Sequence, residues 1–286
     1  MATESESKPG TESVSFVADA RLLSILGEQL IGSEKVGVLE LVKNAYDAGA
    51  TTCVVTIEGV PTLEPTIRAL LEYSELPGPV VEIRDNGSGM SRGDIISGWL
   101  RPATSNRGRI KERLKKERAA AAERGSLESY DALVETLKLE HHGRIPLGEK
   151  GVGRLATHRL GRRLWLRTKT SDDPLEWELR IDWSDFDTLQ AVPVDLSAIP
   201  LTLRHQLPTT DYGPEGHGTV VTCYGGREGY EWTISTLTEL AHAIGSLRSP
   251  RAHAGFSVSF STPHVPPDRL DNPAHLDAPF ELVHSR

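Results

Sequence analysis

Apolar positions recur along this chain with two spacings, one helical and one strand-like. Helices expected from the helical spacing cover residues 18–32, 33–48, 91–100, 152–160 and 232–247. Strands expected from alternation cover residues 53–58, 80–84, 164–170, 177–183, 220–224 and 256–260. Residues 186–217 are rich in Pro and Thr and are predicted to be a loop. The mixture predicts an α+β fold with helices segregated from an antiparallel-leaning sheet.

A block dominated by Lys, Arg, Glu, Ala and Leu, residues 107–140, interrupts this pattern and predicts a long helix or a helical hairpin. Gly125 and Ser126 are the expected break. Because the block is highly charged and poor in apolar residues, we expect residues 104–150 to form a lid that is mobile until a ligand orders it.

Composition indicates an ordinary globular protein, with 38% apolar and 25% charged residues in 286. The net charge of −8 argues against a surface built mainly for nucleic acid. Residues 107–118 are nevertheless strongly basic, which leaves two alternatives: a solvated helix face, or a contact with nucleic acid or an acidic partner. Cys53 and Cys223 lie in predicted strands, so buried thiols are expected.

The ends of the chain carry little apolar material. Residues 1–13 are predicted to be a disordered tail. Residues 14–262 are expected to form the domain, and residues 263–286 a Pro-rich tail or the start of a further domain. Neither a signal peptide nor an apolar run long enough for a membrane span is recognisable, so a cytoplasmic location is expected.

The segment from Glu40 to Thr51 (ELVKNAYDAGAT) places three polar groups on one face of a helix. Glu40, Asn44 and Asp47 are spaced i, i+4 and i+7 among apolar neighbours. An Asn oxygen suits Mg²⁺, which binds few protein groups together with substrate phosphates. A Glu one turn away can deprotonate an attacking water. The face therefore predicts a metal-assisted hydrolytic site, with a polar surface stripe as the plain alternative.

Two glycine segments follow it. In the first, Asp85 follows the strand 80–84 and precedes Gly87, Gly89 and Met90. A carboxylate at Asp85 can accept a hydrogen bond from the amine of adenine. The glycines permit close approach of the backbone, and Met90 offers a soft apolar surface for the base. A simple turn is the alternative. The second segment, residues 148–154, has glycine amides ahead of a helix, which form an anion site. Its candidate phosphate contacts are Gly148, Lys150, Gly151, Val152 and Gly153.

Taken together, these three segments resemble the GHKL superfamily, which includes type II topoisomerase ATPase subunits, ninety-kilodalton heat-shock chaperones, histidine kinases, MutL and MORC proteins. ELVKNAYDAGAT is similar to the MutL-type first box, DNGSGM to the next, and GEKGVGR to the lid loop. Gly216–Thr219 resembles the last box, and residues 99–105 the approach to the lid. The likeness covers about residues 16–225 and is greatest to bacterial GHKL ATP-binding proteins.

The resemblance implies a Bergerat fold, a two-layer α/β sandwich with a helical lid insertion that binds ATP and Mg²⁺. It implies Glu40 as general base, Asn44 as the Mg²⁺ ligand and Asp85 as the adenine acceptor. Thr219 is implied in the adenine pocket. Asp47, Thr104 and Ser105 complete the candidate nucleotide-binding residues.

Function follows from the same resemblance, with alternatives. We expect a slow, Mg²⁺-dependent ATPase that acts as a conformational or ATP-dependent dimerisation switch, in the N-terminal part of a larger machine. A following domain or a partner protein is expected to supply a γ-phosphate contact, for which Lys150 is the internal candidate. The alternatives are a nucleotide-binding regulatory module without significant turnover and a histidine-kinase-type phosphotransferase. Glu40 argues against the kinase, and His141 and His142 lie outside the usual acceptor context.

Overall fold

One mixed β-sheet organises the part of the chain that this computed structural model describes, which comprises residues 18–58, 79–102, 106–148, 151, 153–187, 194–226, 232–246 and 255–262. Its strands are β1 Thr52–Glu58, β2 Val80–Asp85, β3 Arg163–Lys169, β4 Glu176–Asp182, β5 Thr202–Gln206, β6 Gly218–Tyr224 and β7 Ser257–Ser261. The order across the sheet is β5-β4-β3-β6-β2-β1-β7. The pairs are antiparallel except for β1 with β7.

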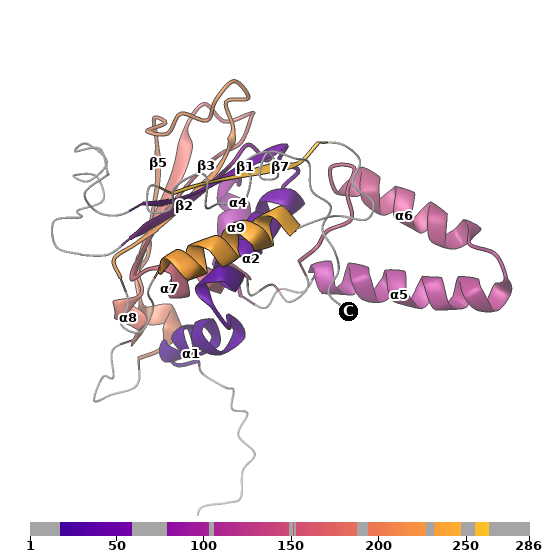
Figure 1. The fold of residues 1–286 in the computed structure, drawn as a ribbon, viewed down its shortest axis with the longest axis horizontal. Helices are drawn as coiled ribbons and strands as arrows, with labels where there is room; N and C mark the ends of the chain where they lie inside the picture. Colours follow the sequence, from indigo (N-terminus) through magenta and orange to yellow (C-terminus); the bar gives the residue numbers. More distant parts are fainter. Residues whose placement is uncertain are drawn as a thin grey trace, which may run out of the picture.

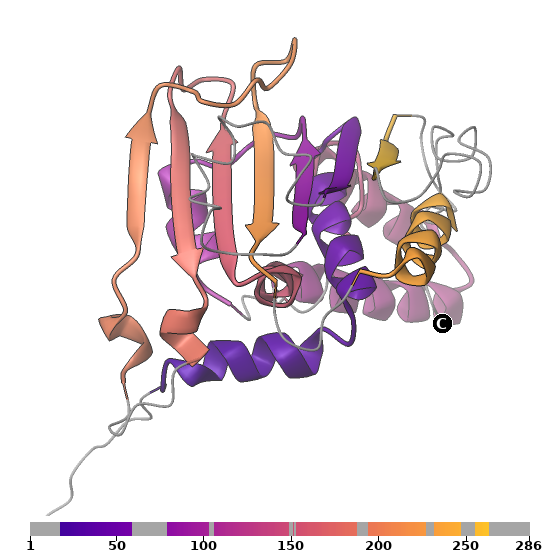
Figure 2. The ribbon, with the colours of Figure 1, turned by 60° about the vertical axis from the view of Figure 1, so that its left-hand side comes forward.

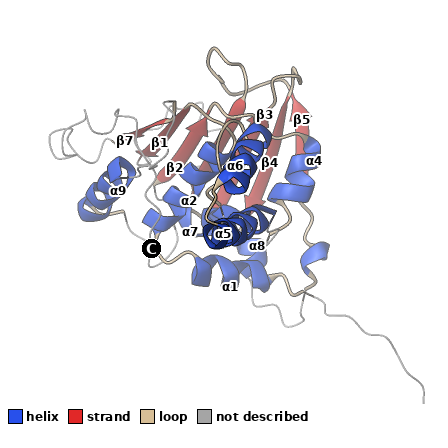
Figure 3. Cartoon of the chain, turned by 90° about the vertical axis from the view of Figure 1, so that its right-hand side faces the viewer, coloured by secondary structure: helices blue, strands red, loops and turns tan. Residues whose placement is uncertain are grey.

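Helices cover one face of this sheet, as Figure 2 shows. The α-helices are α1 Arg21–Leu30, α2 Glu34–Asp47, α4 Arg92–Asp94, α5 Asn106–Arg124, α6 Glu128–Glu140, α7 Ala156–Leu160, α8 Ser184–Asp187 and α9 Ile234–Ser246. A π-helical turn, Ile95–Trp99, continues α4, and 3₁₀ turns occupy Gly153–Leu155 and Leu196–Ala198. Figure 3 shows the helical layer in front of the strands. The predicted α+β sandwich is confirmed.

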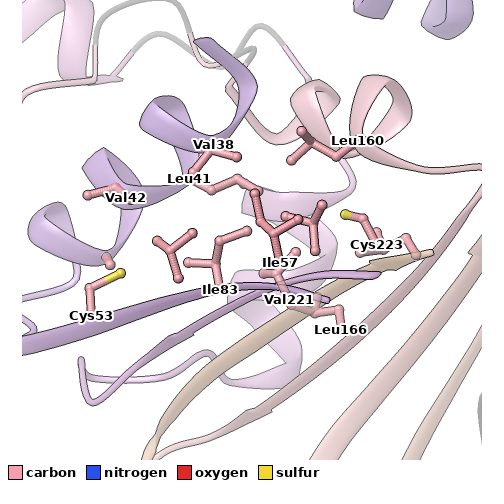
Figure 4. Packing of buried hydrophobic residues seen from close by; sticks show 14 of the residues in the cluster. Val38, Leu41, Val42, Cys53, Ile57, Ile83, Leu160, Leu166, Val221 and Cys223 are labelled. Carbon is pink, nitrogen blue, oxygen red and sulfur yellow. The ribbon is translucent and has the colours of Figure 1, made fainter. Parts of the chain in front are cut away.

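Helix α2 is the central element of the helical layer. Ser33 caps its start by accepting from the Val36 amide at 3.2 Å, and Gly49 follows its end with a φ of +76°. Its buried residues are Gly37, Val38, Leu41, Val42 and Ala45. Figure 4 shows Val38, Leu41 and Val42 packed over strand residues and beside Leu160 of α7. This burial fixes which face of α2 is left for polar groups.

The hairpin predicted in residues 107–140 is present as α5 and α6, broken at Gly125, whose φ is +71°. Figure 1 shows it extending away from the sheet and its helices. It has a small core of its own, made by Leu114, Val134 and Leu137. The hairpin therefore buries more apolar surface than its highly charged composition suggested.

Two local predictions were wrong. Within the segment predicted as a loop, residues 186–217, residues 202–206 form the edge strand β5, and the short helix 184–187 overlaps the start of this segment. Strand β5 carries no apolar alternation, because none of its residues is fully buried and only the half-buried Leu203 packs against the core. The strand is held by pairing with β4, where His205 stacks on Trp177 at 4.1 Å between ring centroids. The helix predicted over residues 152–160 is a 3₁₀ turn followed by only five α-helical residues.

Cys53 and Cys223 are buried in β1 and β6, as expected, and neither is in a disulfide. The tails predicted for residues 1–13 and 263–286 lie outside the described residues. In the described part, no helix combines the length and the hydropathy that crossing a membrane requires.

Candidate functional site

The polar face of α2 brings Glu40, Asn44 and Asp47 together, as their spacing predicts, and all three are half-buried. Gly153 lies directly against this face. A Cβ on Gly153 would lie 3.1 Å from Glu40 Oε2 and 3.8 Å from Asn44 Nδ2. The glycine segment therefore lies close to the carboxylate and the amide, and a side chain at this position would require Glu40 to shift.

Glu40 is engaged by a residue that the sequence did not single out. Lys43, one turn along α2, donates from Nζ to Glu40 Oε1 at 2.7 Å. The other carboxylate oxygen, Oε2, faces Gly153. Its charged partner keeps Glu40 oriented toward the glycine segment.

Asp47 holds the end of the lid segment. Its two carboxylate oxygens accept from the amides of Leu147, at 2.7 Å, and Gly148, at 3.0 Å. Arg144 reinforces this attachment by donating to the carbonyls of Tyr46, at 3.2 Å, and Ala50, at 2.7 Å. The structure thus places Asp47 and Gly148 together, with the Asp47 carboxylate engaged by the protein's own backbone.

The turn after β2 packs against the C-terminal end of the same helix. The Ser88 amide donates to the Ala48 carbonyl at 2.9 Å, and a Cβ on Gly87 would lie 2.9 Å from that carbonyl oxygen. Gly89 has a φ of +67°, and a Cβ there would lie 2.0 Å from the Lys169 carbonyl oxygen. Both glycines are therefore required by close backbone approach, and all three sequence motifs meet on one face of α2.

Asp85, at the start of this turn, is half-buried, and its carboxylate is largely removed from solvent. Burial raises its pKa to about 6 from 3.8, against the opposing effect of hydrogen bonds from the backbone amides of Gly87 and Thr219 and of the nearby His217. The Gly87 amide donates at 2.9 Å. At neutral pH the group is an ionised acceptor held in a costly environment, which is typical of a functional carboxylate.

Beside Asp85, a buried threonine joins the turn to strands β3 and β6. Thr168 Oγ1 accepts from the Met90 amide at 2.9 Å, lies 3.0 Å from Thr219 Oγ1 and donates to the Gly218 carbonyl at 3.1 Å. The candidate pocket residues Met90 and Thr219 are thus fixed by one hydroxyl.

Thr168 and His217 were missed as site residues. His217 Nδ1 donates to the Gly87 carbonyl at 2.6 Å, which ties the loop before β6 to the turn after β2. A signal for Thr168 was present, because it shares the face of Leu164 and Leu166 in β3, where a polar residue interrupts an apolar alternation. His217 lies within Gly216–Thr219, the segment that resembles the last box, but its role was not predicted because its partner lies 130 positions away.

Four predicted site residues, Thr104, Ser105, Lys150 and Val152, lie outside the described residues. Gly151 is described and has a φ of +65°, a conformation that favours glycine. In the part of the chain that the structure covers, no group of three or more His, Cys, Asp or Glu side chains forms a metal cluster. A cation here would have to rely on Asn44 and on oxygens that a ligand brings with it.

Comparison with known proteins agrees with this geometry. A search of curated proteins gives no significant match. Residues 32–219, about two thirds of the chain, match the family described as histidine kinase-, DNA gyrase B-, and HSP90-like ATPases. That span begins just before α2 and ends at Thr219, so it contains every candidate site residue. The chain therefore belongs to this GHKL family and contains its ATP-binding domain.

Proposed function

We propose that this protein is a slow, Mg²⁺-dependent ATPase that works as a nucleotide-driven conformational or dimerisation switch. The observation that carries the proposal is the convergence of three motifs on one face of α2. Gly153 lies over Glu40 and Asn44, Gly148 is bound by Asp47, and Gly87 packs on Ala48. A nucleotide needs these functions side by side: an acceptor for its base, backbone amides for its phosphates and an oxygen for its metal.

The residues present fit ATP and Mg²⁺. Asp85 and Thr219 offer acceptor and hydroxyl groups beside the close-packed glycine turn, where the adenine amine would donate. Because Gly153 has no side chain, its backbone lies close to Asn44 and Glu40, where its segment can offer amides to a phosphate. Asn44 would hold Mg²⁺ through its amide oxygen, and the bound ion would neutralise phosphate charge.

Within this arrangement Glu40 is the group that would take a proton from the attacking water. Lys43 holds one of its oxygens, so the carboxylate is oriented before substrate binds. The same ion pair favours slow turnover, because Glu40 must share its charge between Lys43 and the water. A regulatory module without turnover is the second candidate, and this ion pair is the observation that favours it.

Two substitutions test the proposal. Glu40→Gln should keep binding of a non-hydrolysable ATP analogue, measured by titration calorimetry, and lower turnover by about 10²-fold or more, the usual scale for a lost general base. Asn44→Ala should remove the part of the affinity that depends on Mg²⁺. Glu28→Gln, an exposed carboxylate on α1, is the matched control and should leave both quantities unchanged.

The outcomes separate the two candidates. Turnover that is equal in wild type and Glu40→Gln would eliminate Glu40 as the base and leave the regulatory module. Analogue binding that is unaffected by Mg²⁺ would remove the role given to Asn44. The switch itself predicts that turnover per molecule rises with protein concentration, or when a following domain or partner supplies a further γ-phosphate contact; a constant rate would exclude dimerisation as its basis.

A further inference from the structure

The hairpin of α5 and α6 (residues 106–140, here called the helical arm) is a separate structural unit. Figure 1 shows it extending beyond the sheet and its covering helices. Its apolar cluster, centred on Leu114, Val134 and Leu137, is distinct from the main core. The apolar residues of α5 are thus used against α6, and the rest of α5 is free to face outward.

Charge is distributed very unevenly between α5 and the rest of the molecule, which includes the acidic helix α6. Helix α5 has 19 residues, of which eight are Lys or Arg and three are Glu, a net charge of +5. The whole chain carries −8, so the remainder carries −13. Six basic side chains of α5 are exposed: Arg109, Arg113, Lys115, Lys116, Arg118 and Arg124. A single helix therefore concentrates positive charge on an otherwise acidic protein.

Three of the exposed basic residues form a strip along one face of α5. Arg109, Arg113 and Lys116 are spaced i, i+4 and i+7, so they share one face of α5. At a rise of 1.5 Å per residue they extend over about 10 Å. A DNA strand advances 3.4 Å along the duplex axis per phosphate, so about three phosphates pass along that length. The strip thus matches a row of phosphates in both charge and length.

Local acidic groups neutralise part of this strip, and Arg113 lies close enough to Glu117 for their charges to interact. Glu112 lies 3.8 Å from Lys116, at the limit of an ion pair between two exposed side chains. Glu117 is also engaged by Arg124, at 2.6 Å, and by the Ser129 hydroxyl, at 2.7 Å. Helix α5 nevertheless keeps an excess of positive charge that an external anion could contact.

The strip has no apolar component. A helix that lies in a membrane surface needs an apolar face, and the centre of a protein interface needs aromatic or aliphatic anchors. In α5, Leu114 and Ala121 are buried and Ile110 packs on the cluster shared with α6. A charged, repetitive ligand without apolar requirements is the better match.

The base of the arm is held firmly. Lys111 donates to the Leu147 carbonyl at 2.8 Å, and Arg144 bonds to the carbonyls of Tyr46 and Ala50 at the end of α2. Asp47 holds the amides of Leu147 and Gly148. These contacts present the strip in a fixed orientation away from the acidic body. We propose that the outer face of α5 binds the phosphate backbone of nucleic acid.

The test measures binding without nucleotide, so that it does not depend on ATP chemistry. A fluorescent duplex of about 20 base pairs is titrated with the full chain, and anisotropy is recorded between about 50 and 200 mM salt. Wild type should bind, with an affinity that falls steeply as salt rises. Arg113→Glu/Lys116→Glu should weaken binding by at least about tenfold and reduce the salt slope by about two.

A matched control separates the strip from net charge. Arg21→Glu/Arg92→Glu changes net charge by the same amount at exposed positions on α1 and α4, and should bind like wild type. Arg113→Gln/Lys116→Gln provides a milder pair if the first variant unfolds. Duplex DNA and single-stranded RNA probes show which nucleic acid is preferred; preference for either supports the proposal.

Three results would overturn it: no binding by wild type at the lowest salt, equal losses in the arm and control variants, or tighter binding of an acidic peptide with the same charge. The last would identify a protein partner.

Discussion

The buried carboxylate of Asp85 makes a prediction about stability that needs no ligand. Its pKa is raised from 3.8 to about 6 in the folded protein. The folded protein therefore favours the protonated form of Asp85. The contribution of this carboxyl group to the free energy of unfolding is fully present below pH 3.8. It is lost as pH rises toward 6, because the unfolded chain ionises more readily. A difference of about two pKa units corresponds to about 3 kcal/mol.

Asp85→Asn removes this titration while keeping a similar shape and an oxygen for the Gly87 amide. Between pH 4 and 7.5 the stability of the variant relative to wild type should therefore rise by about 2 kcal/mol, since part of the ionisation in the unfolded chain already occurs at pH 4. Urea unfolding at a series of pH values measures this difference. Groups that do not interact with Asp85 contribute equally in both proteins and cancel.

The same substitution should remove most ATP affinity, because an amide can turn its donor group toward the donor amine of adenine. If Asp85→Asn raises stability and lowers ATP affinity, the Asp85 carboxylate contributes to ligand binding at the expense of stability. Stability curves that remain parallel from pH 4 to 7.5 would show that Asp85 is not desolvated, and unchanged affinity in calorimetry would remove it from the adenine site.

Two further predictions concern the backbone around the site. Gly89→Ala should lower the free energy of unfolding by about 2 kcal/mol or more, because the new Cβ would meet the Lys169 carbonyl at a positive φ. Gly93→Ala is the control, since a Cβ there would lie 3.6 Å from Ser91 Oγ. Equal unfolding midpoints in urea for the two variants would contradict the reasoning. Residues 104–150 should become resistant to trypsin when an ATP analogue is added, and Asp47→Asn, which gives up one of two acceptor oxygens, should raise cleavage there without nucleotide. Cleavage that neither the analogue nor the substitution alters would exclude a nucleotide-ordered lid held by Asp47.

The local spacing of apolar and polar residues was sufficient to predict much of the fold and the side chains on one face of the site. The i, i+4 and i+7 spacing of Glu40, Asn44 and Asp47 determines their common face, since helical geometry alone places them there. Alternation likewise located the strands that enter the core. It could not find β5, because an edge strand without a buried face leaves no apolar period.

Contacts between distant segments were beyond local pattern. Thr168 reaches Met90 across 78 positions, and Asp47 reaches Leu147 across 100. Such pairs depend on how β3 joins the sheet and on where the helical arm returns to α2. Arg144 illustrates the difference: in sequence it is one more basic residue after a charged block, whereas in the structure it closes the end of α2.

Helix α2 binds one end of the glycine segment and lies against the other end, and the length of chain between these two points decides whether phosphates can enter. Asp47 binds Gly148, and Glu40 lies against Gly153. These contact points are seven residues apart on α2, or about 10 Å along its axis. Five residues of extended chain reach up to about 17 Å. The segment therefore has enough length to move away from Asn44 and admit phosphates while Asp47 keeps its hold, so binding need not detach the helical arm from the helix that carries the proposed base.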